Sequence, residues 1–375
     1  MGFRNMKKRA AETVSIAVSA VLVTLAIALP AHAAWPLWND FVAANVEESR
    51  VVDRSDSRRI TTSEGQSYAL FFALVANDPV RFDAILDWTE KNLSGGDITK
   101  TLPAWLWGRT TNGSWGVLDT NNATDSDMWI AYALLEAGRI WERKDLTAKG
   151  LAMMGLLKAH VREVENLGSV LLPGRVGFED KNGTVKLNPS YYPLFILRRF
   201  AAEDAFWARV YDGSLAMLVR SAPSGFSPEW ARFTASGRLV KPEGEDCGTG
   251  SYNAIRTYMW AGMLSPADPS RTILARQFAP MVAATRALNF PPEKTNVATG
   301  DVSAPGPDYF GACLLTLLGN DRTAGLIRTV LTNEGVNPER YYGNVLTLFG
   351  LGFDEGRWGF APDGRLILEG GGGVN

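Results

Sequence analysis

The chain has 375 residues, and its 38 lysines and arginines nearly balance its 40 aspartates and glutamates, for a formal net charge of -2. This balance leaves no basic excess to attract phosphate backbones, so nucleic acid is not an expected partner. The length suffices for one large domain or two ordinary ones, with a sizeable core in either case.

The first residues have the pattern of a secretory signal peptide. Four basic residues among the first nine precede an apolar run over residues 14–29, and Ala31-His32-Ala33 follows as a small-residue cleavage site. We expect cleavage after Ala33, so that residues 1–33 leave and residues 34–375 form an exported protein, periplasmic or secreted. Later apolar stretches fall well short of the roughly 18 residues that span a bilayer, so no membrane span is expected after cleavage.

Histidine and cysteine are scarce in the part that would remain. Of 2 histidines, His32 would leave with the signal peptide and only His160 would stay. Cys247 and Cys313 lie far apart in the sequence and form either a disulfide or two free thiols. A zinc site or a histidine-based nucleophile triad therefore lacks its parts, and carboxylates are the expected catalytic groups.

The helical patterns alternate between two kinds along the chain. Six segments have a polar or turn-forming start and are then apolar on nearly every side, as in helices that are buried all round. They are residues 63–76, 124–138, 189–200, 251–264, 307–318 and 342–353. Six others are amphipathic and suit an outer layer with one solvent face. They are residues 35–49, 79–93, 144–165, 203–222, 268–287 and 322–334. This alternation predicts an all-α (α/α)6 barrel of six inner and six outer helices.

Short β-hairpins are expected in the loops of this barrel. Asn182-Gly183 and Asp363-Gly364 each lie next to β-favouring runs, which is a hairpin signal. Residues 223–250 are rich in Gly, Pro, Ser and charge without a sustained period, which predicts a long loop of the barrel and not an interdomain linker. The tail over residues 370–375 reads GGGGVN and is expected to be disordered.

Glu64 stands at the start of the first buried segment, in the stretch TTSEGQSYAL. Ser63 and Gln66 fit a capping box, and a first-turn acid suits the helix dipole, so a structural role alone explains Glu64. In a helical barrel, however, the starts of alternate inner helices gather at one end, which would bring Glu64 near Asp125 and residues 251–256. Hydrolysis of a glycosidic bond needs two carboxyl groups, one as acid and one as base or nucleophile. Both interpretations of Glu64 stay open at this point.

A series of motifs then points to one family. In chain order they read TTSEGQSYAL, LPAWLWG, NNATDSDMWIAYALLEAGR, LLPGRVGF, LNPSYY, GFSPEW, SYNAIRTYMWAGM, PPEK and YYGNVLTLFG. Together they resemble glycoside hydrolase family 8 from Trp35 to about Phe360, and most closely its branch found beside bacterial cellulose synthase. The resemblance implies one catalytic domain over residues 34–375. It also implies an endo-β-1,4-glucanase that cuts internal bonds of cellulose with inversion at the anomeric carbon.

The resemblance also implies roles for individual residues. Glu64 matches the general acid, and Asp125 matches the acid that binds the sugar at the cleavage subsite. Arg256 matches a residue that positions the attacking water. Asn253 stands where the family keeps the Asp that serves as general base, and an amide is too weakly basic to accept a proton from water.

Three explanations for Asn253 follow from this departure. The residue is an inactivating substitution that traps substrate, or a natural change that leaves a weak enzyme or a glucan-binding protein, or another acid supplies the base. The candidates for such an acid are Glu243, Glu245, Asp246 and Asp308.

Aromatic side chains are the expected sugar platforms, because flat apolar rings suit the faces of sugars. The candidates for substrate binding are Trp105, Trp107, Trp115, Tyr191 and Tyr252. The expected partners are cellulose or soluble β-1,4-glucan chains and, beyond them, the cellulose synthase and export machinery. No metal, nucleotide or organic cofactor is indicated, and a monomer would suffice.

Overall fold

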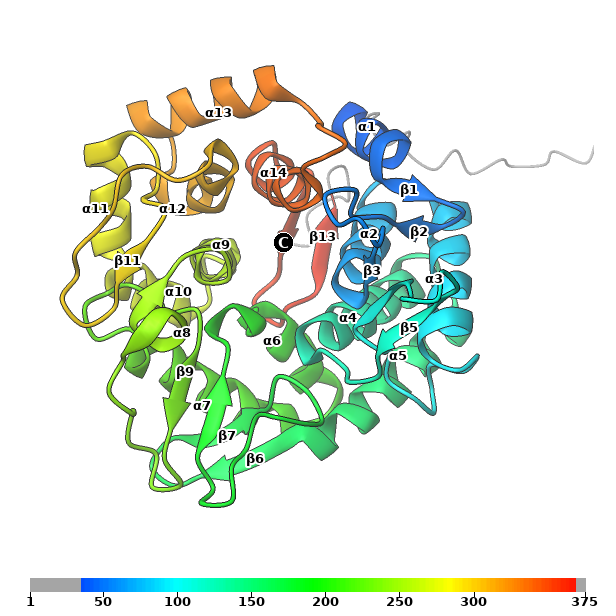
Figure 1. The fold of residues 1–375 in the computed structure, drawn as a ribbon, viewed down its shortest axis with the longest axis horizontal. Helices are drawn as coiled ribbons and strands as arrows, with labels where there is room; N and C mark the ends of the chain where they lie inside the picture. The colour runs from blue at the N-terminus through cyan, green and yellow to red at the C-terminus, as the bar shows by residue number, and fades with distance from the viewer. Residues whose placement is uncertain (1–34, 369–375) are drawn as a thin grey trace, which may run out of the picture. The chain divides into compact units, whose positions relative to one another are not determined.

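Two concentric rings of helices surround a common axis, as the view down that axis shows (Figure 1). The computed structural model describes residues 35–368, which belong to one compact unit. The expected signal peptide and the tail over residues 370–375 lie outside the described residues. No helix among residues 35–368 is both long and apolar enough to cross a membrane.

The inner ring consists of helices that are buried on nearly every side. They are α2 (Ser63–Val75), α4 (Thr124–Ile140), the 3-10 turn η2 (Pro189–Tyr191) leading to α6 (Leu194–Glu203), α9 (Ala254–Met263), the 3-10 segment η3 (Asp308–Leu314) continued by α12 (Leu315–Leu318), and α14 (Tyr341–Asp354). In α2 every residue except Glu64 is buried. Glu64, in the first turn of α2, is therefore the one residue of this helix that is partly open to solvent.

The outer ring covers the inner one with amphipathic helices. They are α1 (Pro36–Asn45), α3 (Pro79–Leu93), α5 (Lys144–Leu157), α7 (Phe206–Arg220), α10 (Pro269–Gln277) with α11 (Ala279–Leu288), and α13 (Arg322–Glu334). The predicted (α/α)6 barrel is confirmed. The bounds of α3 and α13 match the prediction, because an N-cap aspartate, Asp78 or Asp321, precedes each helix and its carboxylate accepts a first-turn N–H.

The prediction of one helix over residues 144–165 is wrong at its C-terminal end. Helix α5 stops at Leu157, and a 3-10 turn (η1, Lys158–His160) leads into strand β6 (Val161–Val164). This strand pairs with β7 (Gly168–Leu171), and Gly168, the first residue of β7 after the turn, has a φ of 100°. Valine-rich segments that can pair across a tight turn favour strand over helix.

The segment over residues 268–287 is broken into two helices where one was predicted. Helix α10 ends at Gln277 and α11 begins at Ala279, with Pro280 in its first turn. Proline has no N–H to continue the helical hydrogen bonds, and its ring clashes with the preceding turn. Pro193 separates η2 from α6 for the same reason.

The strands are short and lie in the loops. The pairs are β1 (Val46–Glu47) with β2 (Arg50–Val51), β8 (Val185–Leu187) with β9 (Ala231–Phe233), β10 (Thr249–Gly250) with β11 (Thr295–Asn296), and β12 (Trp358–Phe360) with β13 (Leu366–Leu368). A three-stranded sheet joins β3 (Thr61–Thr62), β4 (Leu106–Arg109) and β5 (Trp115–Asp119). A short helix, α8 (Gly244–Gly248), interrupts the long loop before β10.

Both predicted hairpin turns are present, one between two paired strands and one closed by an isolated antiparallel bridge. Strands β12 and β13 pair around Asp363-Gly364, where Gly364 has a φ of 81°. Around Asn182-Gly183 the chain also turns back on itself, with an antiparallel bridge between Glu179 and Val185 and a hydrogen bond from the Lys186 N–H to the Phe178 carbonyl at 2.8 Å. Strand β8 then pairs further with the distant β9. The distant partner β9 lies inside the long loop over residues 223–250, so no local turn signal reveals it.

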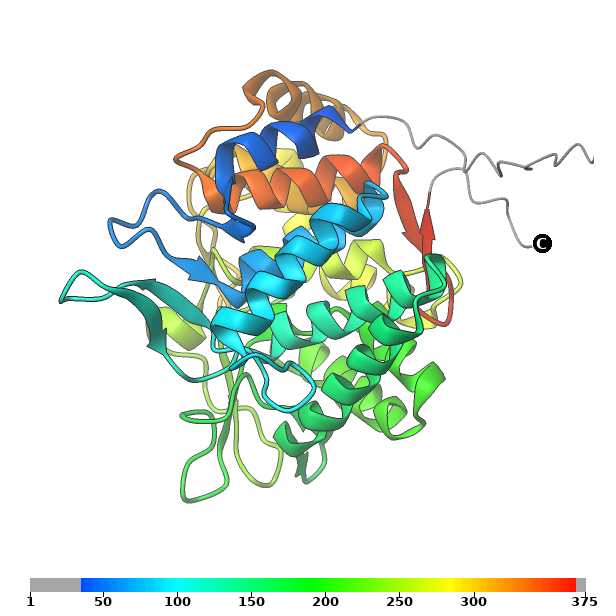
Figure 2. The same ribbon diagram turned by 90° about the vertical axis from the view of Figure 1, so that its right-hand side faces the viewer.

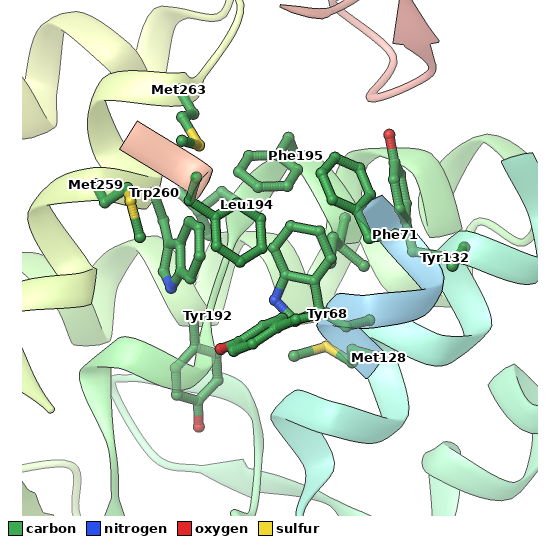
Figure 3. Close-up of a cluster of buried hydrophobic side chains, with 14 of the residues drawn as sticks. Tyr68, Phe71, Met128, Tyr132, Tyr192, Leu194, Phe195, Met259, Trp260 and Met263 are labelled. Carbon is green, nitrogen blue, oxygen red and sulfur yellow. The ribbon is translucent and has the colours of Figure 1, made fainter. Parts of the chain in front are cut away.

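The two ends of the barrel carry different structures. In the side view the β4–β5 ribbon projects from one end, and the β12–β13 hairpin lies at the other (Figure 2). Between them the interior is packed with aromatic and methionine side chains (Figure 3). The ring of Trp129 lies 5.0 Å from that of Phe71, 5.4 Å from Trp260 and 5.3 Å from Phe349, centre to centre. This core fixes the inner helices and so fixes the side chains at their N-terminal starts.

Candidate active site

Glu64 is placed by the junction of strand β3 with helix α2. The hydroxyl of Thr62 accepts a hydrogen bond from the Gly65 N–H at 3.1 Å and so caps the helix. The Glu64 side chain is 22% exposed. The first-turn position is thus as predicted, on a helix anchored by both a cap and a sheet.

The predicted capping box between Ser63 and Gln66 is wrong. Thr62 is the N-cap, and the Ser63 hydroxyl is buried without a hydrogen-bond partner. The Gln66 amide instead accepts the Val51 N–H at 2.7 Å and donates to the Thr89 hydroxyl at 2.9 Å. A buried N–H at the end of β2 needs an acceptor, and Gln66 is the group that supplies it.

Asp125 lies in the first turn of α4 and is only 3% exposed. One of its carboxylate oxygens accepts the Ser126 N–H at 2.7 Å. Burial raises the pKa of Asp125 from 3.8 to about 6, Arg256 opposes this rise, and Glu64 reinforces it. Asp125 therefore exchanges its proton near neutral pH and not in the usual acidic range.

Arg256 brings the acids together from the first turn of α9. Its guanidinium is 3% exposed and forms an ion pair with Glu64 through Nη1. The same nitrogen lies 4.0 Å from an oxygen of Asp125. A single buried cation thus faces two carboxylates that come from different inner helices.

The other contacts of Arg256 extend the cluster around the ring. Nη1 donates to the Tyr68 hydroxyl and Nη2 to the Ser190 hydroxyl, each at 3.2 Å. Nη2 also donates to Oδ1 of Asn253 at 3.0 Å. The structure therefore brings Glu64, Asp125, Asn253 and Arg256 into one connected group at a single end of the barrel.

Asn253 directly precedes α9 and is half-buried. Its amide nitrogen donates to a carboxylate oxygen of Glu229 at 2.8 Å. Sequence reasoning missed Glu229, although the residue lies in the quoted motif GFSPEW. The available signal was a carboxylate in a Pro-containing loop, but its partner is 24 residues further along the chain.

Within the described residues, the four acids considered as replacement bases are not members of the hydrogen-bonded cluster around Arg256. Glu243 pairs with Lys241, and Asp246 pairs with Lys186 at 2.9 Å. Glu245 is exposed on α8, and Asp308 begins η3. Among residues 35–368, no hydrogen bond or ion pair joins any of the four to Asn253 or Arg256.

Two of the tryptophans predicted to bind sugar, Trp107 and Trp115, lie on the three-stranded sheet whose strand β3 leads into α2. The rings of Trp107 and Trp115 stack at 5.2 Å and 14°, and Trp115 is 47% exposed. The Arg50 guanidinium lies 5.0 Å from one ring centre and 5.1 Å from the other, so it sits beside the pair and not between the rings. The Trp105 carbonyl accepts the Ser63 N–H at 3.0 Å, which ties this sheet to the start of α2.

The two predicted tyrosines occupy different settings. Tyr191 is half-buried, with its ring 6.2 Å from that of Trp230. Tyr252 is 42% exposed and packs edge-on against Phe310 at 5.0 Å. Tyr252 adjoins Asn253 in the chain, so an exposed ring lies directly beside the cluster.

Within the described residues no group of three His, Cys, Asp or Glu side chains is placed to hold a metal ion. Cys247 is half-buried and Cys313 is buried, and both are free thiols. The polar groups that contact Arg256 are carboxylates, an amide and hydroxyls.

Paired acids on a helical barrel, next to an exposed tryptophan platform, suit acid-base cleavage of a sugar polymer, and the class that they define is the glycoside hydrolases. The chain belongs to this class as a member of glycosyl hydrolases family 8, whose sequence model matches residues 12–356.

Similar proteins carry related descriptions. An endoglucanase of Escherichia coli O157:H7 is 42% identical over 93% of this chain and 95% of its own length. An endoglucanase of Xanthomonas axonopodis pv. citri (strain 306) is 42% identical over 93% of each chain. The crystal structure of an endo-1,4-D-glucanase from Vibrio fischeri ES114 superposes with a TM-score of 0.85 and 42% identity, over 90% of this chain and 99% of that one.

Proposed function

We propose that the protein is an endo-β-1,4-glucanase that cleaves internal bonds of cellulose with inversion. The observation that carries the proposal is the contact of Arg256 with Glu64, Asp125 and Asn253 at one end of the barrel. The names of the similar proteins, endoglucanase and endo-1,4-D-glucanase, support the same reaction.

In this proposal each member of the cluster has a distinct role. Glu64 protonates the leaving oxygen, and Asp125 binds the sugar at the cleavage subsite. Arg256 and the Asn253 amide hold the attacking water. Asn253 hydrogen-bonds this water without taking its proton, which predicts slow turnover.

Substrate binding is assigned to aromatic side chains around the cluster, of which Trp115 and Tyr252 are exposed. Trp107 and Trp115 form the platform on one side, Trp105 precedes the same strand, and Tyr191 and Tyr252 contribute from the starts of other inner helices. A sugar face stacked on Trp115 would cover apolar surface that is otherwise in water.

The setting of the enzyme is part of the proposal. Residues 34–375 act as one catalytic domain, exported to the periplasm as a monomer after removal of residues 1–33. There the protein works beside cellulose synthesis and export. Mass measurement of the protein recovered from periplasm tests the cleavage site, since a mass that includes residues 1–33 contradicts it.

The test of the activity is reducing-end release from carboxymethylcellulose, xylan and chitosan. We expect release from carboxymethylcellulose above the other two, and a product whose anomeric configuration is inverted when followed by NMR. Release from xylan or chitosan in preference to carboxymethylcellulose would overturn the glucan assignment.

A second function, glucan binding with little turnover, is favoured by Asn253 alone. Calorimetric binding of a cello-oligosaccharide together with the turnover assay separates the two functions. Binding without any turnover supports the binding function, provided that Glu64→Gln binds the cello-oligosaccharide as tightly as the unaltered chain.

A further inference from the structure

The two terminal nitrogens of the Arg256 guanidinium are held by different parts of the barrel. Nη1 forms an ion pair with Glu64 and donates to the Tyr68 hydroxyl, and both of these residues belong to α2. Nη2 donates to Oδ1 of Asn253 at 3.0 Å and to the Ser190 hydroxyl at 3.2 Å. Nε is buried and has no hydrogen-bond partner within the described part of the chain. The place of the nitrogen that faces Asn253 therefore depends on Ser190.

The Ser190 hydroxyl is itself oriented by Asn188. Both residues are buried at the turn η2 before α6, Asn188 with 0% and Ser190 with 2% exposure. Oδ1 of Asn188 accepts the Ser190 hydroxyl at 2.8 Å and the Ser190 N–H at 3.0 Å. A hydroxyl has one proton and two acceptor lone pairs, and an amide oxygen only accepts. The Ser190 proton therefore points to Asn188, which leaves the lone pairs of the hydroxyl for the guanidinium.

The backbone of η2 is fastened to the helix that carries Arg256. The indole N–H of Trp260, one turn after Arg256 in α9, donates to the Ser190 carbonyl at 2.9 Å. Pro189 lies between Asn188 and Ser190, and its ring fixes the backbone φ angle there. The carbonyl and the hydroxyl of one serine thus meet two successive turns of α9, so the hydroxyl is held at a constant place relative to the guanidinium.

We propose that Asn188 and Ser190 are positioning residues of the active site, which hold Nη2 of Arg256 in place beside Asn253. We call these hydrogen bonds, from Arg256 to Ser190 and from Ser190 to Asn188, the Ser190 network. Because both residues are buried, they act through Arg256 and not by contact with glucan. The effect on catalysis rests on the proposed function, in which Arg256 and the Asn253 amide hold the attacking water, whereas the network itself does not.

The kinetic test compares Ser190→Ala with the unaltered chain on carboxymethylcellulose. Loss of one hydrogen bond to a charged group is expected to lower kcat by about 10-fold. KM should change by less than about 2-fold, because a displaced water weakens the chemical step more than glucan binding. Ser214→Ala is the matched control, since the buried Ser214 hydroxyl donates only to the Val210 carbonyl of the outer helix α7. The control should lower the Tm without changing kcat.

Asn188→Ala and the double variant separate positioning from a general loss of stability. In Ser190→Ala the Asn188 amide still accepts the backbone N–H of residue 190, so the addition of Asn188→Ala should lower the Tm further. It should not lower kcat further, because the hydroxyl that Asn188 orients is already gone. Losses of kcat that multiply in the double variant overturn the proposal. If the variants at position 188 do not fold, Ser190→Ala and Ser214→Ala decide, and equal kcat values in these two proteins overturn it.

An NMR measurement tests the Ser190 network without reference to activity. In protein labelled with a nitrogen isotope in its arginine side chains, the Arg256 signals are those missing from the spectrum of Arg256→Lys. An Nη group held by two acceptors rotates slowly and gives separate proton signals, whereas a freed group rotates and its signals merge. We expect separate Nη2 signals in the unaltered chain and in Ser214→Ala, and merged signals in Ser190→Ala.

The outcomes distinguish the two proposals. Separate Nη2 signals in Ser190→Ala overturn the Ser190 network even if the chain cleaves glucan. The expected spectra in a set of proteins that all fail to cleave glucan support the network and overturn the proposed function.

Discussion

Tyr341 donates a hydrogen bond to Oε1 of Glu64 across 3.3 Å, although 277 residues separate the two in the chain. Tyr341 begins α14, the last inner helix, and Glu64 lies in the first turn of α2, the first one. The first and last inner helices are thus joined through the side chain of Glu64. With Arg256 on the other oxygen, both oxygens of Glu64 are held by residues from distant parts of the chain.

The first prediction concerns Glu64. Glu64→Gln keeps the shape of the side chain and its contact with Tyr341 but removes the transferable proton, so we expect kcat to fall by about 10²–10⁴-fold. Reducing-end release under saturating carboxymethylcellulose measures the change, with the Tm as a control for folding. A folded variant that keeps most of its activity would show that Glu64 is not the acid.

Asp125 predicts a pH dependence of stability. Its folded-state pKa of about 6 lies above its usual 3.8, so the folded protein binds more protons than the unfolded chain between those values. Stability therefore falls as the pH rises through this range, by about 3 kcal/mol from this group. Asp125→Asn removes the effect while its amide oxygen can still accept the Ser126 N–H.

Urea unfolding at a series of pH values measures this prediction. We expect Asp125→Asn and the unaltered protein to have similar free energies of unfolding below about pH 4, and the variant to be the more stable one at pH 7. Parallel curves across the whole range would contradict the raised pKa of Asp125.

Glu136 gives a stability prediction far from the reaction. It is fully buried in α4 and accepts hydrogen bonds from Arg199 at 2.5 Å and from the backbone N–H of Leu366 at 2.8 Å. Glu136→Gln leaves the buried Arg199 short of a counter-charge, so we expect a loss of about 3 kcal/mol in the free energy of unfolding. Glu203→Gln alters the half-exposed partner of the same arginine and should cost about 1 kcal/mol or less. Equal losses in the two variants would show that burial of the carboxylate does not determine how much its ion pair with Arg199 stabilises the protein.

Trp115 predicts an effect on binding more than on turnover. One face of its ring stacks on Trp107, and the side chain is 47% exposed. Trp115→Ala should raise KM by about 2–10-fold with little change in kcat, because stacking that is equal in ground and transition states affects binding alone. Trp115→Phe keeps a flat ring and should recover much of the loss. A fall in kcat at unchanged KM would instead place Trp115 in the chemical step.

The barrel could be predicted from sequence because its signals are local. All-round apolar helices alternate with amphipathic ones, and Asp78 and Asp321 mark helix starts within a few residues. The errors arose where a competing local interaction acts. The valines at 161 and 164 favoured a hairpin, and Pro280 broke the helix that the hydrophobic pattern extended.

The site was predictable only in part, for a different physical reason. Glu64, Asp125, Asn253 and Arg256 could be named from motifs at helix starts, and the structure brings them together. Glu229 could not, because its role depends on a loop that folds back onto N–H groups 22 to 25 residues away. The composition of that loop gives no sign of which donors its carboxylate meets.

The aromatic packing of the barrel interior limits how a polymer can meet this molecule. The rings of Phe71, Trp129 and Phe349 contact one another across the axis of the described part of the barrel. A polysaccharide chain therefore cannot pass through the barrel along this axis. A long polysaccharide chain has to bind to the outer surface and dissociate from it again. Binding at the outer surface requires no free chain end, so a site in the middle of a long polysaccharide is as accessible to this barrel as a site near its end.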